Sequence, residues 1–250
     1  MSHRTVAAAV TAGVALSAGI AGPAAAHASA RCPLPVVKTG ARFAPHVHAG
    51  RDSARVTNPY FPLRVGRVLV YAGAKDGTPT VDVVVATRRT VRINEVRTRA
   101  VEDRLYEAGR LAERTTDYYG QDRCGNVWYF GEDTAELDTS GRVVSTEGSF
   151  RAGVKGAQPG VIMPAHPRPG PWIRQEWFPG QAEDTFRVVS RRAHVTVPFG
   201  TFSGAVRTHE RTALEPGVLD EKVYVRGVGE VLERTVRGAR ETAALVEVLN

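Results

Sequence analysis

The chain has 250 residues, a formal net charge of +7 and two cysteines. The positive charge is spread along the chain, and basic residues alternate with acidic ones in segments such as 97–104, which argues against a nucleic-acid partner. A chain of this length can bury a sizeable core in one domain and does not require two.

The first thirty residues have the order of parts that is typical of a secretory signal peptide. Arg4 precedes an apolar run over 6–20, and an A-x-A site ends the segment at 28–30. A transmembrane anchor is the alternative, but Ala and Gly dominate the run and Gly22-Pro23 interrupts it. The sequence therefore predicts a leader over 1–30, a secreted or envelope-associated location, and no transmembrane segment in the mature chain.

Residues 31–56 carry Pro, Gly, Arg and His without periodicity, which predicts a poorly ordered N-terminal segment. Cys32 and Cys124 lack both a C-x-x-C spacing and an adjacent histidine, so a structural role is favoured over a redox or metal role. In an oxidising compartment two such thiols usually pair, and we expect a Cys32–Cys124 disulfide. A single β domain is predicted over 57–250.

From Val68 onward the sequence reads as strand after strand. β-Branched and aromatic residues are enriched, turn residues recur at short intervals, and no segment has a convincing helical period. Strands joined by tight turns must be antiparallel neighbours, because a parallel pair needs a long crossover. The expected strands cover 68–71, 80–87, 90–93, 96–106, 111–122, 126–132, 143–146, 172–178, 185–197, 201–214, 222–225, 230–236 and 242–249.

Residues 152–171 interrupt this pattern with a high density of Gly and Pro, and so long a structureless stretch is unusual in a compact domain. We interpret it as a functional loop or a covering flap. The predicted fold is all-β and mainly antiparallel: a single curved meander sheet that forms a half-barrel or open barrel, with a concave apolar face and the Pro- and Gly-rich flap.

The most aromatic part of the chain predicts a central hairpin. In the expected register Tyr118 faces Phe130 and Gly120 faces Trp128, and Tyr119 meets Tyr129 on the other side. Aromatic residues on both faces indicate a two-sided core, and the competing interpretation is an aromatic wall of a ligand cavity. The candidate ligand-binding residues are Tyr118, Trp128 and Phe130 from this hairpin, His166 from the flap, and Trp172 after it.

Several carboxylates lie near the same hairpin. Calcium needs six or more oxygen ligands, a paired-carboxylate hydrolase needs two acids facing each other across a cleft, and neither spacing is specific here. Solvated strand ends and turn caps are the favoured interpretation. The residues concerned are Asp117, Asp122, Glu132, Asp133, Glu136 and Asp138.

The histidines do not form a recognised motif. His46-Val47-His48 could chelate a metal from one face of an extended segment, but it lies in the N-terminal segment. His166 lies in the flap, where functional residues are often found. Because no zinc-protease, serine-hydrolase or phosphate-loop motif occurs, we predict no metal site, no cofactor and no assigned catalytic residue.

Five sequence blocks carry a family resemblance. They read N-P-Y-F-P-L at 58–63, G-N-V-W-Y-F-G-E-D-T at 125–134, S-T-E-G-S at 145–149, V-P-F-G-T-F at 197–202 and G-V-G at 227–229. Together they resemble the signature of a family of uncharacterised secreted bacterial proteins, which has no assigned activity to carry over. The layout of the V-P-x-G-x-F turn and the late G-V-G strand is similar to periplasmic half-barrels of the lipoprotein-carrier kind.

Two function classes remain open. The first is a non-enzymatic, exported binding or envelope-associated module that holds a small apolar or lipid-like ligand under the flap. The second is a metal-dependent or acid/base hydrolase that uses His166 with Asp122, Glu132 or Asp133, which requires these groups to converge in one cleft. The lack of a catalytic motif favours the first, and neither hypothesis specifies an oligomeric state.

Overall fold

Strands and turns, without a helix, make up the part of the chain described by the computed structural model, which covers residues 32–38 and 43–250. All the strand pairs are antiparallel. The predicted all-β, antiparallel fold is confirmed, whereas the leader predicted over 1–30 lies outside the described residues. Within those residues there is no helix whose length and hydropathy would let it span a bilayer.

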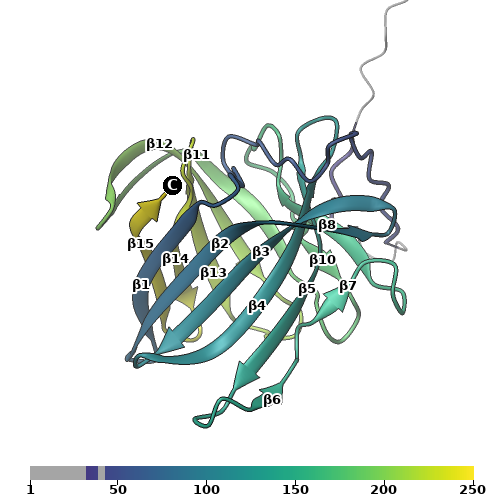
Figure 1. The fold of residues 1–250 in the computed structure, drawn as a ribbon. Coiled ribbons are helices and arrows are strands. Elements are labelled where there is room, and N and C mark those ends of the chain that lie inside the picture. The colour runs from purple at the N-terminus through teal and green to yellow at the C-terminus, as the bar shows by residue number, and fades with distance from the viewer. Residues whose placement is uncertain (1–31, 39–42) are drawn as a thin grey trace, which may run out of the picture. The chain divides into compact units, whose positions relative to one another are not determined.

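The strands belong to one curved sheet (Figure 1). Most neighbours are consecutive in the chain and joined by tight turns that contain glycine or a residue with positive φ, such as Asp76-Gly77. The strands are β1 (Val68–Lys75), β2 (Thr78–Ile93), β3 (Val96–Glu107), β4 (Arg110–Gln121), β5 (Val127–Leu137), β6 (Val143–Ser145), β7 (Phe150–Arg151), β8 (Gln158–Met163), β9 (Ile173–Arg174), β10 (Glu176–Trp177), β11 (Thr185–Val197), β12 (Gly200–Arg211), β13 (Leu219–Val225), β14 (Gly229–Arg237) and β15 (Glu241–Leu249).

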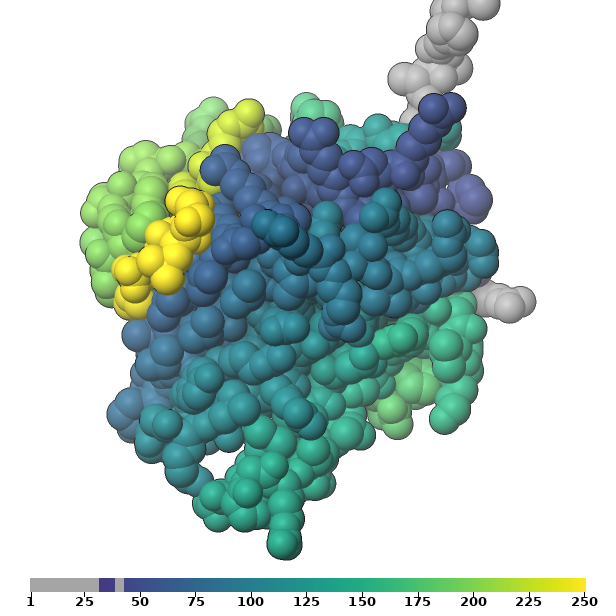
Figure 2. All heavy atoms as spheres, in the orientation of Figure 1, coloured from purple at the N-terminus to yellow at the C-terminus, as the bar shows by residue number. Residues whose placement is uncertain are grey.

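The first and last strands of the domain lie side by side. β1 pairs with β15 from Val68 opposite Leu249 to Lys75 opposite Glu241, so the two halves of the meander form one continuous sheet. Figure 1 shows this sheet curling around an interior, and Figure 2 shows atoms of β1 to β5 packed over one outer face. The path runs β8-β5-β4-β3-β2-β1-β15-β14-β13-β12-β11.

A short segment, residues 173–177, connects the two edges of the sheet, and we call it the strap. Its β9 pairs with β11 and its β10 pairs with β8, so the ladder does not close directly and the barrel stays open as a sheet. Gly160 on β8 allows the strap to approach, because a Cβ there would lie 2.4 Å from the carbonyl carbon of Gln175.

The Gly- and Pro-rich segment is only partly a loop. Its central residues form β8, in which Val161 lies opposite Trp128 of β5. The sequence did not predict this strand, because Pro159 and Gly160 have low strand propensity. Residues 164–171 remain outside the named strands.

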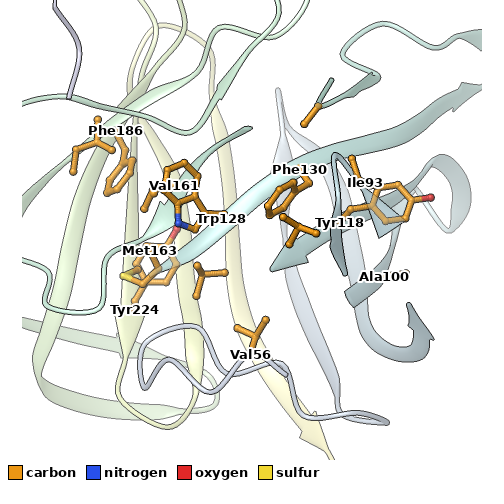
Figure 3. Packing of buried hydrophobic residues seen from close by; sticks show 14 of the residues in the cluster. Val56, Ile93, Ala100, Tyr118, Trp128, Phe130, Val161, Met163, Phe186 and Tyr224 are labelled. Carbon is orange, nitrogen blue, oxygen red and sulfur yellow. The ribbon is translucent and has the colours of Figure 1, made fainter. Parts of the chain in front are cut away.

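The aromatic hairpin has the predicted register next to its turn and packs on both faces. Gly120 lies opposite Trp128, and Tyr119 lies opposite Tyr129, but the register shifts between Asp117 and Tyr119, so the predicted pair of Tyr118 with Phe130 is not part of the ladder. Trp128 belongs to a buried cluster on one side, shown in Figure 3, whereas Tyr129 and Phe150 form a second cluster. The interpretation of a two-sided core is therefore confirmed.

The described parts of residues 31–56 contact the domain at several points. The Val37 amide donates to the Trp172 carbonyl at 2.9 Å, and the Arg123 amide donates to the His48 carbonyl at 3.0 Å. The predicted disulfide is present between Cys32 and Cys124, whose Cα atoms are 6.1 Å apart.

Candidate functional site

The inward-facing residues line a cavity of about 330 Å³. This volume is near the lower limit of small-molecule sites, which span about 300–1,000 Å³. Part of the wall is apolar and aromatic and includes Phe61, Leu63, Leu69, Ile162 and Val228. The carboxyl groups in the wall are those of Asp82, Asp103, Asp117, Glu132, Glu176, Asp184, Glu210, Glu230 and Glu233.

Strand register places these acids on one face. Residues that lie opposite each other on neighbouring strands point to the same side of a sheet. Val84 lies opposite Asp103, and Asp117 lies opposite both Val101 and Glu132. The sequence predicted a concave apolar face, and that expectation is wrong, because these acids point inward from the strands.

Asp117 and Glu132 form the best-defined acidic pair of the wall. Burial, followed by the negative charge of Asp103, raises the pKa of Asp117 to about 7. Burial, followed by the charge of Asp117, raises the pKa of Glu132 to about 8. The Tyr129 hydroxyl lies 2.6 Å from Asp117 Oδ1 and 3.0 Å from Glu132 Oε2, so one donor bridges the two carboxyls.

Burial also shifts the pKa values of Asp82, Asp103, Glu176, Glu210 and Glu230 toward their neutral forms. Burial is the main reason that the pKa of Asp82 rises to about 6 and that of Glu230 to about 8. Burial and the facing Asp82 raise the pKa of Asp103 well above its ordinary value. Burial raises the pKa of Glu176 and Glu210 in the same direction.

Lys222 is the one basic side chain in the cavity wall of the described structure. Its Nζ lies 3.2 Å from Glu233 Oε1 and 3.6 Å from Glu210 Oε2. Burial alone would lower the pKa of Lys222, but these carboxylates raise it well above its ordinary value. Lys222 is therefore held as an ammonium ion, which excludes it as a neutral nucleophile.

Two buried acceptors in the wall have no hydrogen-bond partner within the described part of the chain: Gln175 Oε1 and Asp82 Oδ1. The Gln175 side chain is 4 % exposed, and its amide nitrogen donates to Glu210 Oε2 at 3.1 Å. Both unpaired atoms accept hydrogen bonds, so each of them lacks a donor.

None of the five predicted ligand-binding residues lies in this wall. Tyr118, Trp128 and Phe130 are at most 2 % exposed and belong to the cluster in Figure 3. The Trp172 ring packs beneath the guanidinium groups of Arg187 and Arg211. His166 lines a separate hollow with residues that include Asn58, Cys124 and Gly125.

The residues of the hydrolase hypothesis do not converge. Glu132 faces the cavity inside the sheet, whereas the Asp133 carboxylate pairs with Arg151 Nη2 at 2.7 Å. Asp122 accepts hydrogen bonds from the turn that follows it and from Trp128 Nε1. Across the described residues, no hydrogen bond or ion pair joins His166 to a carboxylate, so the requirement for a shared cleft is not met.

Two remaining carboxylates fit the interpretation as strand-end and turn residues. Asp138 accepts hydrogen bonds from the Ser140 and Arg142 amides, and Glu136 is exposed on β5. The one group of three potential metal ligands in the described chain is Cys32, Asp122 and Cys124, and both of its sulfur atoms are in the disulfide. The carboxylates of the cavity form no such group.

Sequence reasoning named Asp117 and Glu132 but interpreted them as solvated strand-end or turn residues, which is wrong for this pair, and it missed the other wall acids. A usable signal was the alternation of an acid with apolar residues along a strand, as in Val81-Asp82-Val83. The alternation shows that two faces differ, but it does not show which face is inside.

No protein-family model and no curated protein sequence matches the chain. Solved structures with similarity to it include a protein from Bacteroides fragilis described as exported, with a YmcC-like fold. It has 12 % identity and a TM-score of 0.45, over 78 % of this chain and 100 % of the other. A protein from Parabacteroides distasonis, described as a lipoprotein, has 10 % identity and a TM-score of 0.42, over 77 % of this chain and 99 % of the other.

Proposed function

We propose that the chain is an exported, non-enzymatic binding module that holds a small amphiphilic molecule in the barrel cavity. The observation that carries this proposal is the cavity itself, about 330 Å³ of space bounded by an apolar part and a hydrogen-bonding part. A sheet whose concave face was filled by its own side chains would offer no such space.

The apolar part of the wall is suited to contact a hydrocarbon portion of the ligand. Phe61, Pro62 and Leu63 contribute to the wall from the segment that precedes β1. Hydrogen bonds hold this segment to the turn between β13 and β14, because the Gly227 amide donates to the Pro59 carbonyl at 2.7 Å. The wall at this part of the cavity is therefore supported by backbone contacts.

The polar part changes the expected ligand from a purely apolar one to an amphiphile. A hydrocarbon that filled the cavity would displace water from Gln175 Oε1 and Asp82 Oδ1 without replacing its hydrogen bonds. Each buried acceptor left unpaired costs about 1–3 kcal/mol. A ligand with donors at one end avoids this cost.

Two observations support export. The Cys32–Cys124 disulfide fits an oxidising compartment, where such bonds form and persist. The order of residues in 1–30 fits a secretory leader. An enzymatic function has no comparable support, because the residues proposed for hydrolysis lie in different surroundings.

Native mass spectrometry of protein purified from its own host tests the proposal. We expect a bound small molecule in the wild type and in Val81→Phe, which adds a ring at an exposed position of β2. Val84→Phe adds the same ring inside the cavity and should lose the molecule. The proposal fails if no variant carries a small molecule and if 1-hexanol, hexylamine and hexanoate all show no contact with the wild type in saturation-transfer NMR.

A further inference from the structure

We propose that the ligands of this cavity are organic ammonium ions, whose N–H groups are received by Asp117, Glu132 and the side-chain oxygen of Gln175. The hydrocarbon part of the ligand lies against the aromatic and aliphatic wall. This inference rests on the proposed function and adds the chemical class of the ligand.

The composition of the wall favours a cation. Nine carboxyl groups and one ammonium group line the cavity, and no arginine or histidine of the described chain lines it. Lys222 pairs with Glu210 and Glu233. The remaining acids, Asp82, Asp103, Asp117, Glu132, Glu176, Asp184 and Glu230, have no ion pair with a described residue.

The unpaired atoms of the wall provide a second, independent observation. Gln175 Oε1 is a neutral acceptor, so its need for a donor does not depend on the protonation of the acids. The amide nitrogen of Gln175 donates a hydrogen bond to Glu210, and this bond orients Gln175 Oε1. An ammonium group carries up to three donors, so it is able to donate to more than one acceptor.

The arrangement favours an organic cation over a metal ion. Calcium takes six to eight oxygen ligands, and magnesium demands a near-ideal octahedron. Within the described chain, no three carboxylates of the cavity bring their oxygen atoms within 4.8 Å of one another. Tyr119 and Phe61, whose ring centroids are 5.0 Å apart, also line the cavity and suit a hydrocarbon or a cation over a ring face.

Binding of an ammonium ion should release protons. Burial keeps Asp117 and Glu132 partly protonated at neutral pH, with pKa values of about 7 and 8. A bound ammonium favours the carboxylate, so each ion pair that forms with a protonated acid sends one proton to solvent. The titratable groups that act on this pair from the surrounding elements are Asp103, Glu113, Tyr119, Tyr129, Glu176, Asp184 and Lys222.

Three six-carbon probes that differ in charge test the inference by isothermal titration calorimetry at pH 8. We expect hexylammonium to bind at least about tenfold more tightly than 1-hexanol, which is about 1.4 kcal/mol, and hexanoate to bind more weakly than both. Hexylammonium affinity should rise from pH 6 to pH 8, by up to about tenfold per pH unit for each proton released. Titrations in buffers of different ionisation enthalpy count those protons.

Amide variants locate the site. Asp117→Asn combined with Glu132→Gln should remove most of the preference for hexylammonium over 1-hexanol and should flatten its pH dependence. Glu136→Gln is the matched control, because Glu136 lies on the same strand as Glu132 but is exposed and outside the cavity wall. The wild-type pH profile tests the inference even if the double variant does not fold.

The outcomes separate this inference from the proposed function. If 1-hexanol binds as tightly as hexylammonium at every pH, the cavity binds amphiphiles and the ammonium assignment is wrong. The same conclusion follows if hexanoate binds best or if the folded double variant keeps the preference. If none of the three probes binds, the ammonium assignment is wrong, and the proposed function fails with it only if native mass spectrometry also finds no bound small molecule.

Discussion

The Tyr129 hydroxyl donates to Oδ1 of Asp117 at 2.6 Å, from the neighbouring strand and inside the cavity wall. It also lies 3.0 Å from Glu132 Oε2. Burial raises the pKa of both acids, whereas the hydrogen bond from Tyr129 favours their ionised forms and lowers it. Tyr129 thus limits how far the acids of this pair shift toward neutrality.

Tyr129→Phe should destabilise the protein, mainly at high pH. Without the hydroxyl, the pKa values of Asp117 and Glu132 should rise further, and two buried acceptors lose their shared donor. We expect a loss of about 1–3 kcal/mol in the free energy of unfolding at pH 8. The loss should be smaller at pH 5, where both acids are protonated. Urea denaturation at the two pH values measures it.

Tyr119→Phe is the control for this prediction. Tyr119 is partly buried, lines the same cavity and stacks on Tyr129 with ring centroids 5.0 Å apart. Within the described structure its hydroxyl makes no hydrogen bond, so its removal should cost less than about 0.5 kcal/mol. Equal losses in the two variants would show that the Asp117 contact contributes no net stability.

Without ligand, the protein should lose stability as pH rises from about 5 to 8. The pKa of Glu132 is about 8 in the folded protein against an ordinary value of 4.5, and the pKa of Asp117 is about 7 against 3.8. Between the ordinary and the raised pKa of each acid, the folded state binds more protons than the unfolded state, so raising the pH favours unfolding. The stability from these groups is fully present below about pH 4 and is lost once pH passes about 8.

Thermal unfolding measured from pH 5 to pH 8 checks this sign. Each unit of pKa difference corresponds to about 1.4 kcal/mol. A net loss of about 2 kcal/mol would lower Tm by roughly 4–8 °C for a domain of this size. Asp117→Asn with Glu132→Gln should flatten the slope. A Tm that rises over this interval in the wild type would contradict the assignment of buried, neutral acids.

Asp122→Ala should be strongly destabilising, because Asp122 organises the turn of the aromatic hairpin. Its carboxylate accepts from the amides of Cys124 and Asn126, from the Asn126 side chain and from Trp128 Nε1. Several of these donors are buried and would lose their partner, which predicts a loss of about 3 kcal/mol or more.

A second turn residue provides the control for Asp122. Asp138 also accepts from two backbone amides, but it is exposed, so Asp138→Ala should cost less than about 1 kcal/mol. Chemical denaturation of the two variants gives the comparison. Similar losses would mean that burial does not distinguish the two turns.

Much of the fold could be predicted from the sequence, because local patterns determine it. A tight turn sets the register of the hairpin in which Tyr119 pairs with Tyr129, and both tyrosines lie only a few residues from that turn in the sequence. β8 could not be predicted in this way. Its Pro159 and Gly160 disfavour a strand locally, and only the approach of Gln175 in three dimensions explains why a glycine is needed there.

The candidate site could be predicted only in part. In β2, Asp82 faces the cavity, whereas Val81 is 42 % exposed, so the usual rule that polar residues point outward is reversed. The acids of the wall come from strands that are distant in the chain, and Lys222 meets Glu210 only through the pairing of β12 with β13. Nothing in a single strand shows that these groups share an interior.

Removal of the disulfide should destabilise the protein through the unfolded state. Cys32 and Cys124 are 92 residues apart, and closing so long a loop is worth about 4 kcal/mol on the chain-entropy model. The Cys32→Ser, Cys124→Ser double variant should lose about this much in urea denaturation. Dithiothreitol should destabilise the wild type and leave the double variant unchanged. A loss below about 1 kcal/mol would mean that the N-terminal contacts hold without the bond.

Gly160→Ala should loosen the strap that holds the edges of the sheet. The added Cβ would lie 2.4 Å from the Gln175 carbonyl carbon and 2.5 Å from the Arg174 carbonyl oxygen, so the backbone of the strap must move. We expect a loss of about 1–3 kcal/mol and faster hydrogen exchange where Arg174 pairs with Thr185. Gly50→Ala is the control, because a Cβ at Gly50 meets nothing within 4 Å. If the two variants are equally stable, the strap is not held in place by its approach to Gly160.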